Sequence, residues 1–155
     1  MNLHVREASP DDAKTIADFN SRMALETEGR PLDPAVIGPG VQSALADAGK
    51  GRYCVAEVDG EVVGHIMVTY EWSDWRNGDL WWIGSVYVHE DYRRIGVFSD
   101  LYRHVESLAR QDEGVCGLRL YVEQDNKRAH ETYRKLGMVL PGYQVMEVDF
   151  EKDAK

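Results

Sequence analysis

Two dipeptides, Asp59-Gly60 and Asn77-Gly78, constrain how the middle of this chain can fold. Asp, Asn and Gly tolerate the positive φ angles of a tight turn, and apolar-rich runs flank each dipeptide, so each predicts an antiparallel hairpin. The runs expected to form the strands are residues 52–58, 61–70 with a continuation over 69–72, and 80–88. The fold is therefore expected to contain a meander of three antiparallel strands.

Helix signals precede this meander. Residues 3–6 alternate as a short strand, and Ser9-Pro10 then begins a helix that is expected to run to about Glu28. A second helix over residues 34–47 would be interrupted by Gly38-Pro39-Gly40. Because proline removes a helical hydrogen bond and glycine weakens a helix, we expect a loop or two short helices there.

Helices and strands alternate after the meander. Apolar residues recur at helical spacing over residues 97–108, and residues 117–122 read as a strand. A helix over 126–136 ends at Gly137, and the alternation of residues 143–150 predicts a strand that closes the sheet. This order of elements predicts an α+β fold, with helices flanking one mixed α/β sheet.

Composition limits the function classes. The chain has 155 residues, 43% of them apolar and 29% charged, which suits one soluble domain over 1–155 with a polar tail at 151–155. The net charge of −9 argues against nucleic-acid binding. Neither a signal peptide nor a membrane-spanning run is visible, so no membrane role and a cytoplasmic location are expected. Cys54 and Cys116 lie in apolar runs without metal-ligand spacing, so buried free thiols and no metal site are expected.

The segment Tyr92-Arg93-Arg94-Ile95-Gly96-Val97 passes from a strand into a helix. Unpaired N–H groups and the helix dipole favour an anion at such a helix start, and Gly96 allows the close approach of the backbone. Arg93 and Arg94 can add charged contacts to phosphate oxygens. The segment matches neither a nucleotide P-loop nor a dinucleotide fingerprint. A capped helix with two solvated arginines is the alternative.

Two motifs together resemble the GNAT superfamily of N-acetyltransferases. The segment just described is similar to its acetyl-CoA motif, Arg/Gln-x-x-Gly-x-Gly/Ala. Asn126-x-x-Ala129-x-x-x-Tyr133-x-x-x-Gly137-Met138 is similar to its second motif. The separation of the motifs and the element order also match, so the resemblance covers nearly the whole chain. It implies a mostly antiparallel, twisted sheet of about six to seven strands, flanked by about four helices, with strands 4 and 5 splayed.

The resemblance also implies site residues. CoA would enter the gap between the splayed strands, and backbone groups of Tyr87 and Val88 would pair with its pantetheine arm. The N–H groups that would hold the pyrophosphate belong to Arg93, Arg94, Ile95, Gly96, Val97 and Phe98. Asn126 would contact the CoA arm, and Tyr133 would be the general acid beside the sulfur.

Phe98 departs from the motif, which normally has Gly or Ala at this position. Its backbone N–H is retained, so contact with phosphate stays feasible. The ring must either turn into the core or crowd the cofactor, and the core is favoured because burial stabilises a large aromatic side chain.

Acyl transfer to an amine requires a neutral amine and a proton for the leaving thiolate. A phenol can supply that proton. The residue that acts as the base is not assigned, and the candidates are the carboxylates at strand ends, Glu71, Asp74, Asp79 and Glu123. Glu123 is the first candidate because it lies just before Asn126. His89 is expected to be structural. Cys116 lacks a recognisable His partner, so direct transfer through a ternary complex is expected rather than a covalent acyl-enzyme.

All four tryptophans lie in one predicted hairpin. Strand alternation places Trp81 and Trp82 on opposite faces, so one is expected in the core and the other beside the acceptor. The residues expected to line an acceptor pocket are Glu26, Glu71, Trp72, Trp75 and Trp82. Aromatic and acidic groups together suit a cationic amine, although core packing and cross-strand pairing also account for the tryptophans.

These observations predict an enzyme that transfers an acetyl group from acetyl-CoA to a primary amine. Two alternatives stay open, a non-catalytic acyl-CoA-binding or sensing module, and an acetyltransferase that acts on a protein lysine or N-terminus. The expected partners are a CoA thioester and a small amine or peptide amine, and a homodimer is a further prediction. The sequence does not identify the acceptor, the acyl chain length or the base.

Overall fold

The structure is a computed structural model that describes residues 1–153. The chain divides into two compact units, Met1–Tyr121 and Val122–Lys155. The last two residues of the predicted polar tail, 154–155, lie outside the described residues.

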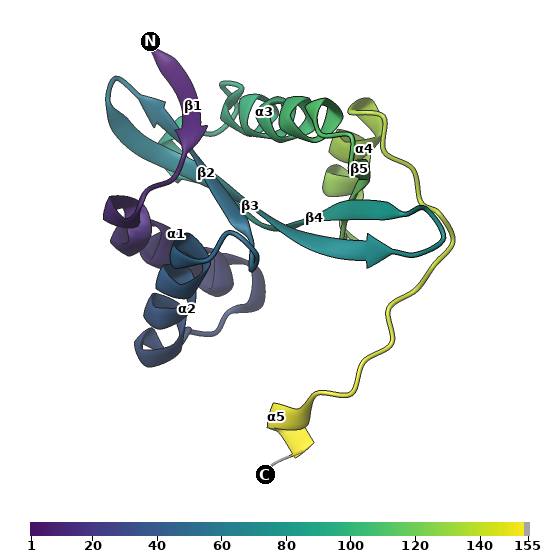
Figure 1. The fold of residues 1–155 in the computed structure, drawn as a ribbon. Helices are drawn as coiled ribbons and strands as arrows, with labels where there is room; N and C mark the ends of the chain where they lie inside the picture. Colours follow the sequence, from purple (N-terminus) through teal and green to yellow (C-terminus); the bar gives the residue numbers. More distant parts are fainter. Residues whose placement is uncertain (154–155) are drawn as a thin grey trace. The chain divides into compact units, whose positions relative to one another are not determined.

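The first unit contains one five-stranded sheet in the order β1-β2-β3-β4-β5 (Figure 1). The strands are β1 (Leu3–Glu7), β2 (Arg52–Val58), β3 (Glu61–Ser73), β4 (Gly78–Val88) and β5 (Val115–Leu120). The first four strands pair antiparallel, and β5 pairs parallel with β4. The predicted meander and the mixed α/β fold class are thus confirmed.

Local turn chemistry sets both hairpins. Asp59 and Gly60 have φ angles of 51° and 85°, and Asn77 has a φ of 50°. These are the left-handed conformations that Asp, Asn and Gly adopt at low cost. The two predicted turns are therefore confirmed at the predicted residues.

The helices of the first unit lie on both sides of its sheet (Figure 1). They are η1 (Pro10–Asp12), α1 (Ala13–Glu28), α2 (Pro34–Ala46), η2 (Glu90–Tyr92) and α3 (Val97–Gln111). On one side, Ile16 of α1 and Val41 of α2 pack against Tyr53 and Val55 of β2. Helix α3 covers the other side and buries an apolar stripe that includes Leu101. This burial supplies the driving force that holds the helices on the sheet.

The expectation of a loop or two short helices over residues 34–47 was wrong, because α2 is continuous through Pro39. Asp33 caps the helix by accepting a hydrogen bond from the Ala35 N–H at 2.9 Å. Val41 and Ala44 are buried in the core beyond the proline. Tertiary burial of this face therefore outweighs the poor local propensity.

The second unit contains α4 (Lys127–Lys135) and the short α5 (Phe150–Asp153). The Asn126 side chain caps α4, and Gly137 follows its end with a φ of 93°. No strand is assigned within residues 143–150, so the expected closing strand is absent and the described sheet has five strands rather than six to seven. Alternation predicts a strand-like face, but a strand exists only where a neighbour completes its hydrogen-bond ladder.

The two cysteines differ. Cys54 is buried in β2, and burial raises the pKa of its thiol to about 11. Cys116 is exposed, so the expectation of two buried thiols was wrong for this residue. It lies in β5, the last strand of the sheet, where one flank has no neighbouring strand. No described helix is both long enough and apolar enough to span a bilayer.

Candidate functional site

Strand β4 changes its partners at Gly84. Across β3 and β4 the pairing steps from Met67–Ser85 to Val68–Ile83, which leaves Gly84 as an extra residue on β4. The parallel pairing of β4 with β5 ends at the same place, at Ile83–Leu120. Residues 84–88 therefore pair with β3 alone, and their other edge is outside the sheet ladder. The strand β4 thus has a bulge at Gly84 and an edge beyond it that is not paired with β5.

Tyr87 and Val88 lie in this segment. The Tyr87 ring is buried, and its hydroxyl donates a hydrogen bond to Glu26 Oε1 at 3.2 Å. The Val88 carbonyl accepts a hydrogen bond from Arg93 Nε at 2.8 Å. Both residues therefore lie beside the segment that leads into α3.

That segment has the backbone geometry of an anion cradle. Arg94 and Gly96 have positive φ angles of 68° and 92°, and the Asp100 N–H bonds the Gly96 carbonyl at 3.0 Å to begin the α3 ladder. The amides before Asp100 precede the first α-helical hydrogen bond, as at any helix start. A Cβ on Gly96 would meet no atom within 4 Å, so the positive φ angle is the reason for glycine.

Arg93 is held by an acidic residue. Its Nη2 donates hydrogen bonds to both carboxylate oxygens of Glu26, at 3.2 and 2.9 Å, and its guanidinium carbon lies 5.3 Å from the centre of the Tyr87 ring. Glu26 was expected in an acceptor pocket, but the structure places it against Arg93 and Tyr87. Together with desolvation of Tyr87, this carboxylate raises the pKa of the phenol.

Phe98 is half-buried at the start of α3. Its ring centre lies 6.3 Å from that of Tyr102, which is buried one turn further along the helix. The ring thus lies near Tyr102 on the same helix, and its expected turn into the core stays a prediction.

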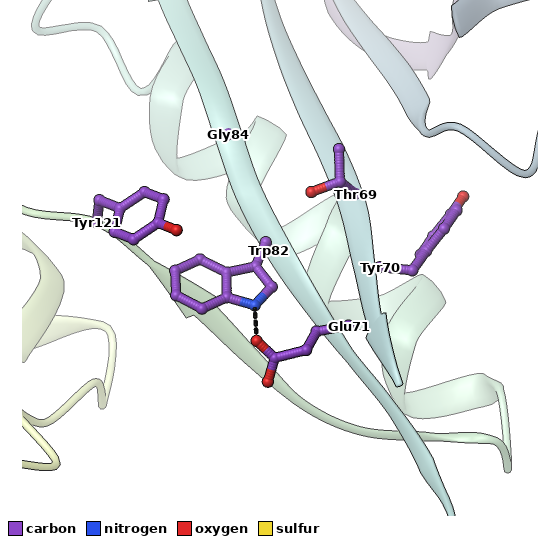
Figure 2. A pocket seen from close by; sticks show the side chains of 6 residues that line it. All are labelled: Thr69, Tyr70, Glu71, Trp82, Gly84 and Tyr121. Atoms are coloured by element: carbon purple, nitrogen blue, oxygen red, sulfur yellow. Dashed lines mark hydrogen bonds between the residues drawn. The ribbon is translucent and has the colours of Figure 1, made fainter. Parts of the chain in front are cut away.

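A pocket of about 290 Å³ lies at the bulge. It is lined by Thr69, Tyr70, Glu71, Trp82, Gly84 and Tyr121 (Figure 2). Figure 2 shows the Trp82 indole between the Tyr121 ring and the Glu71 carboxylate. The Trp82 and Tyr121 ring centres are 4.5 Å apart, and Trp82 Nε1 donates to Glu71 Oε2 at 2.9 Å. The site therefore combines an aromatic wall with a carboxylate of fixed orientation.

Arg119 of β5 is the second partner of that carboxylate. Its Nη1 donates to Glu71 Oε1 at 2.8 Å, so the two oxygens of Glu71 have different partners. The strand register places Arg119 directly beside Trp82. These contacts hold the Glu71 side chain in one position before any acceptor binds.

The tryptophans divide as strand alternation predicts. Trp81 is buried and packs edge-on against Tyr70, at 6.0 Å between ring centres, whereas Trp82 lines the pocket. Trp72 and Trp75 are 61% and 93% exposed and are not among the lining residues. Two of the five residues expected in the pocket, Glu71 and Trp82, thus lie in this one.

The second unit contains the remaining expected site residues. Asn126 Oδ1 accepts the Ala129 N–H at 3.0 Å, so this oxygen caps α4. Burial raises the pKa of Tyr133, which keeps the phenol protonated at neutral pH. Glu123 has an exposed side chain, and its backbone carbonyl lies 3.0 Å from His130 Nε2. The roles of these residues toward a bound donor stay predictions.

Sequence reasoning missed the pocket residues Thr69, Tyr70, Gly84 and Tyr121, and it also missed Arg119, which pairs with Glu71. A signal was available for two of them, because residues two apart in a strand share a face. Thr69 is two residues from Glu71, and Gly84 is two residues from Trp82. The contribution of β5 depended on its register and had no comparable signal.

Two other expectations concern His89 and metals. His89 Nδ1 accepts the Asp91 N–H at 3.1 Å and so caps η2, which is a structural contact. Within residues 1–153, no group of three or more His, Cys, Asp or Glu side chains is arranged to hold a metal ion.

Comparisons with known proteins identify the family of this chain. The model of the Acetyltransferase (GNAT) family matches residues 16–138. The thialysine N-epsilon-acetyltransferase of Bos taurus is 34% identical over 76 residues, which are 49% of this chain and 44% of that protein. The N-alpha-acetyltransferase of Sulfurisphaera tokodaii is 34% identical over 94 residues, 57% of this chain and 56% of that protein. The chain thus matches about half the length of these curated relatives.

Solved structures share the fold over most of the chain. A crystal structure described as a possible acetyltransferase from Clostridium difficile 630 has a TM-score of 0.90 at 46% identity, covering 96% of this chain and 98% of that one. An aminoglycoside N-acetyltransferase, AAC(6')-Iy, in complex with CoA has a TM-score of 0.79 at 12% identity, covering 96% of this chain and 95% of that one. The second likeness concerns the fold alone.

Proposed function

The chain belongs to the GNAT family of acetyltransferases, and on that basis we propose that it transfers an acetyl group from acetyl-CoA to a primary amine. The bulge at Gly84, where the pairing of β4 with β5 ends beside an aromatic and acidic pocket, carries this proposal. A donor bound along the open edge of β4 would bring its acetyl group to that pocket. The acceptor amine would approach from the pocket side.

The donor contacts proposed here use mainly the backbone. The amides from Arg93 to Phe98 would hold the pyrophosphate, and the open edge of β4 at Tyr87 and Val88 would pair with the pantetheine amides. Asn126 would contact the same arm. The positive φ angles of Arg94 and Gly96 support the phosphate assignment, because successive left-handed and helical residues turn their N–H groups to one side. The aminoglycoside acetyltransferase described above holds CoA on the same fold.

The proposed reaction is direct transfer within a ternary complex. The amine nitrogen attacks the thioester carbonyl carbon, a C–N bond forms, and the C–S bond breaks. The amine loses one proton to a base or to water, and the leaving thiolate takes one proton, which Tyr133 would supply. At neutral pH an alkylamine exists mostly as its protonated ammonium form, which cannot attack. A base or a water chain that removes this proton therefore assists the reaction. Glu123 stays the first candidate for the base.

No acyl-enzyme step is included. Cys116 is exposed, and its Sγ contacts the Asp79 carbonyl at 3.3 Å. A carbonyl oxygen can accept a hydrogen bond from the thiol but cannot remove its proton as a catalytic base would. This contact therefore does not activate the sulfur as a nucleophile.

A protein acceptor is the second candidate function. One curated relative is named for N-epsilon acetylation of thialysine and the other for N-alpha acetylation, so both names concern acetylation at nitrogen. An open groove would favour a peptide, whereas a pocket of about 290 Å³ is small and favours a compact amine. A non-catalytic acyl-CoA-binding module differs from both enzymes because it would bind the thioester without releasing free thiol.

The test is release of free thiol from acetyl-CoA with a panel of polyamines, amino acids, aminoglycosides and peptides, followed by mass spectrometry of the acceptor. A gain of one acetyl group on an amine is the expected result. Binding of CoA without thiol release for any acceptor would contradict the proposal and favour the binding module. Association of two copies stays a prediction, to be checked by light scattering.

A further inference from the structure

We propose that the acceptor is a short aliphatic diamine, with Glu71 as the counter-ion of its distal ammonium while the reacting amine lies at the Gly84 bulge. This inference rests on the proposed acetyl transfer and assigns its acceptor class. It follows from the separation of the two ends of the pocket, from its aromatic wall and from its charge.

The two ends are separated by Trp82. Gly84 and Trp82 are two residues apart on β4, about 7 Å at roughly 3.3 Å per residue, and Glu71 lies beyond the indole nitrogen. Figure 2 shows Gly84 and the Glu71 carboxylate on different sides of Trp82. An amine that reacts at the bulge would therefore have the Trp82 ring between it and the carboxylate. The carboxylate suits a second group on the same molecule.

The aromatic wall suits an alkyl chain between the two amines. The Trp82 and Tyr121 rings stand 4.5 Å apart and tilted by 38°, which closes the space between them and leaves their outer surface toward the pocket. Methylene groups gain by covering such apolar surface, and an ammonium gains from the ring faces. Thr69 lines the pocket as well, whereas the Tyr70 ring points away from Trp82 (Figure 2).

Charge selects a cation at the distal end. Among the described residues that line the pocket, Glu71 carries the charge, and Arg119 pairs with one of its oxygens at 2.8 Å, so a cation would bind the carboxylate beside that pair. A carboxylate offers about four lone-pair sites, of which Trp82 and Arg119 use two. The remaining sites can accept hydrogen bonds from an ammonium. The rival is an anionic distal group recognised by Arg119, which is tested directly below.

Gly84 makes room for the reacting end. Its backbone has no positive φ angle, and a Cβ at this position would meet no atom within 4 Å. A larger side chain at position 84 would therefore extend into open space without straining the fold. This makes Gly84→Val a steric probe of the reacting end, just as Glu71→Gln is a charge probe of the distal end.

The experiment compares 1,4-diaminobutane, 1-aminobutane and 4-aminobutanoate as acceptors in the thiol-release assay. The diamine is expected to have the highest kcat/KM, by roughly 10-fold or more, as for a hydrogen bond to a charged group. Glu71→Gln should lower kcat/KM for the diamine more than for 1-aminobutane, so that the preference for the diamine is lost. Gly84→Val should lower kcat/KM for both the diamine and 1-aminobutane. Glu61→Gln removes the same charge from the exposed start of β3 and should change kcat/KM for neither amine.

Each outcome of this experiment either supports or overturns the diamine assignment. Equal rates for the diamine and the monoamine would overturn the diamine assignment while leaving acetyl transfer intact, and a preference for 4-aminobutanoate would assign the distal end to Arg119 instead. If no amine releases thiol, acetyl transfer fails. The inference is then decided by calorimetric binding of 1,4-diaminobutane to the CoA-loaded protein. Binding that weakens in Glu71→Gln supports it, and absent binding or unchanged affinity overturns it.

Discussion

Arg93 and Glu26 form a two-point contact between the start of α3 and the end of α1. One guanidinium nitrogen reaches both carboxylate oxygens, at 3.2 and 2.9 Å, and Tyr87 donates to the same carboxylate. Arg93 was expected to contact the donor phosphate. In this structure its guanidinium is paired with Glu26 of α1, so a pyrophosphate bound as proposed would compete with Glu26 for the same cation.

Glu26→Gln is therefore expected to tighten CoA binding. Removal of the carboxylate charge frees Arg93 and lowers repulsion of the phosphates, and the pair is partly exposed, so we expect the Kd to fall by only about 2- to 5-fold. Calorimetric titration with CoA measures this. Glu28→Gln is the matched control, because it removes the same charge two residues away from a looser pair with Arg30 at 3.7 Å. Weaker binding in Glu26→Gln would mean that Glu26 positions Arg93 rather than competing for it.

Tyr133→Phe tests the proposed proton donor. The kcat is expected to fall by about 100-fold, a typical contribution of general acid catalysis, with the Kd for CoA nearly unchanged. Burial raises the pKa of Tyr133 above its ordinary value of 10.0, so the protonated phenol is lost only as the pH rises through that raised value. We expect the kcat of the wild-type protein to decline as the pH rises through the raised pKa of Tyr133. The kcat of the variant should not show this decline. Unchanged turnover in the variant would remove Tyr133 from the mechanism.

Phe98→Gly tests whether this aromatic serves folding or the cofactor. The ring packs toward Tyr102, so we expect a loss of about 2 kcal/mol in the free energy of unfolding from lost burial and from glycine in a helix. The backbone N–H persists, so CoA should still bind. Chemical denaturation and CoA titration measure the two effects, and Phe98→Leu keeps the helix propensity as a second variant. A folded Phe98→Gly protein that no longer binds CoA would show that the ring serves the donor site.

His65 is a buried, uncharged histidine. It is 0% exposed, both ring nitrogens lie in the core without a hydrogen-bond partner among the described residues, and its ring stacks on Phe19 with centres 6.0 Å apart. Burial lowers its pKa from 6.5 to about 4. As the pH falls from 6.5 toward 4, the unfolded chain takes up a proton at this site and the folded protein does not. The folded state therefore loses stability over this range.

His65→Leu should remove that part of the pH dependence. We expect the wild-type protein to lose roughly 3 kcal/mol more than the variant between these two pH values. Guanidinium unfolding at pH 7.5, 6, 5 and 4 provides the comparison. Carboxylates such as Asp12, whose pKa the Arg6 guanidinium lowers, titrate in both proteins and cancel in the difference. Identical pH slopes for the two proteins would contradict the assignment of a neutral His65.

Features that depend on a few neighbouring residues were predictable. The turns at Asp59-Gly60 and Asn77-Gly78 follow from residues that accept a positive φ angle, and the Asn126 cap follows from a short side chain before a helix. Gly96 at the start of α3 belongs to the same class, because the φ angle that requires it is a property of one residue. The local backbone conformation of the segments proposed to bind the donor could therefore be predicted from the sequence.

Features that depend on distant residues were not predictable. Helix α2 continues through Pro39 because Val41 and Ala44 are buried in the core, and residues 143–150 alternate without forming a strand. The number of strands in the sheet was overestimated for the second reason. The local sequence pattern predicts which secondary structure a segment can adopt. Burial against the core and hydrogen-bonding partners in the sheet decide which one it adopts.

By itself the sequence determined the hairpins, the helix starts and the glycine-dependent turn before α3, because each depends on backbone angles and hydrogen bonds within a few residues. Only the tertiary structure decided the composition of the pocket at the bulge. Gly84, Trp82 and Tyr121 meet there through the bulge in β4 and the register of β5. Register is a non-local property, set by how whole strands bury their faces against the helices, and no short stretch of sequence contains it.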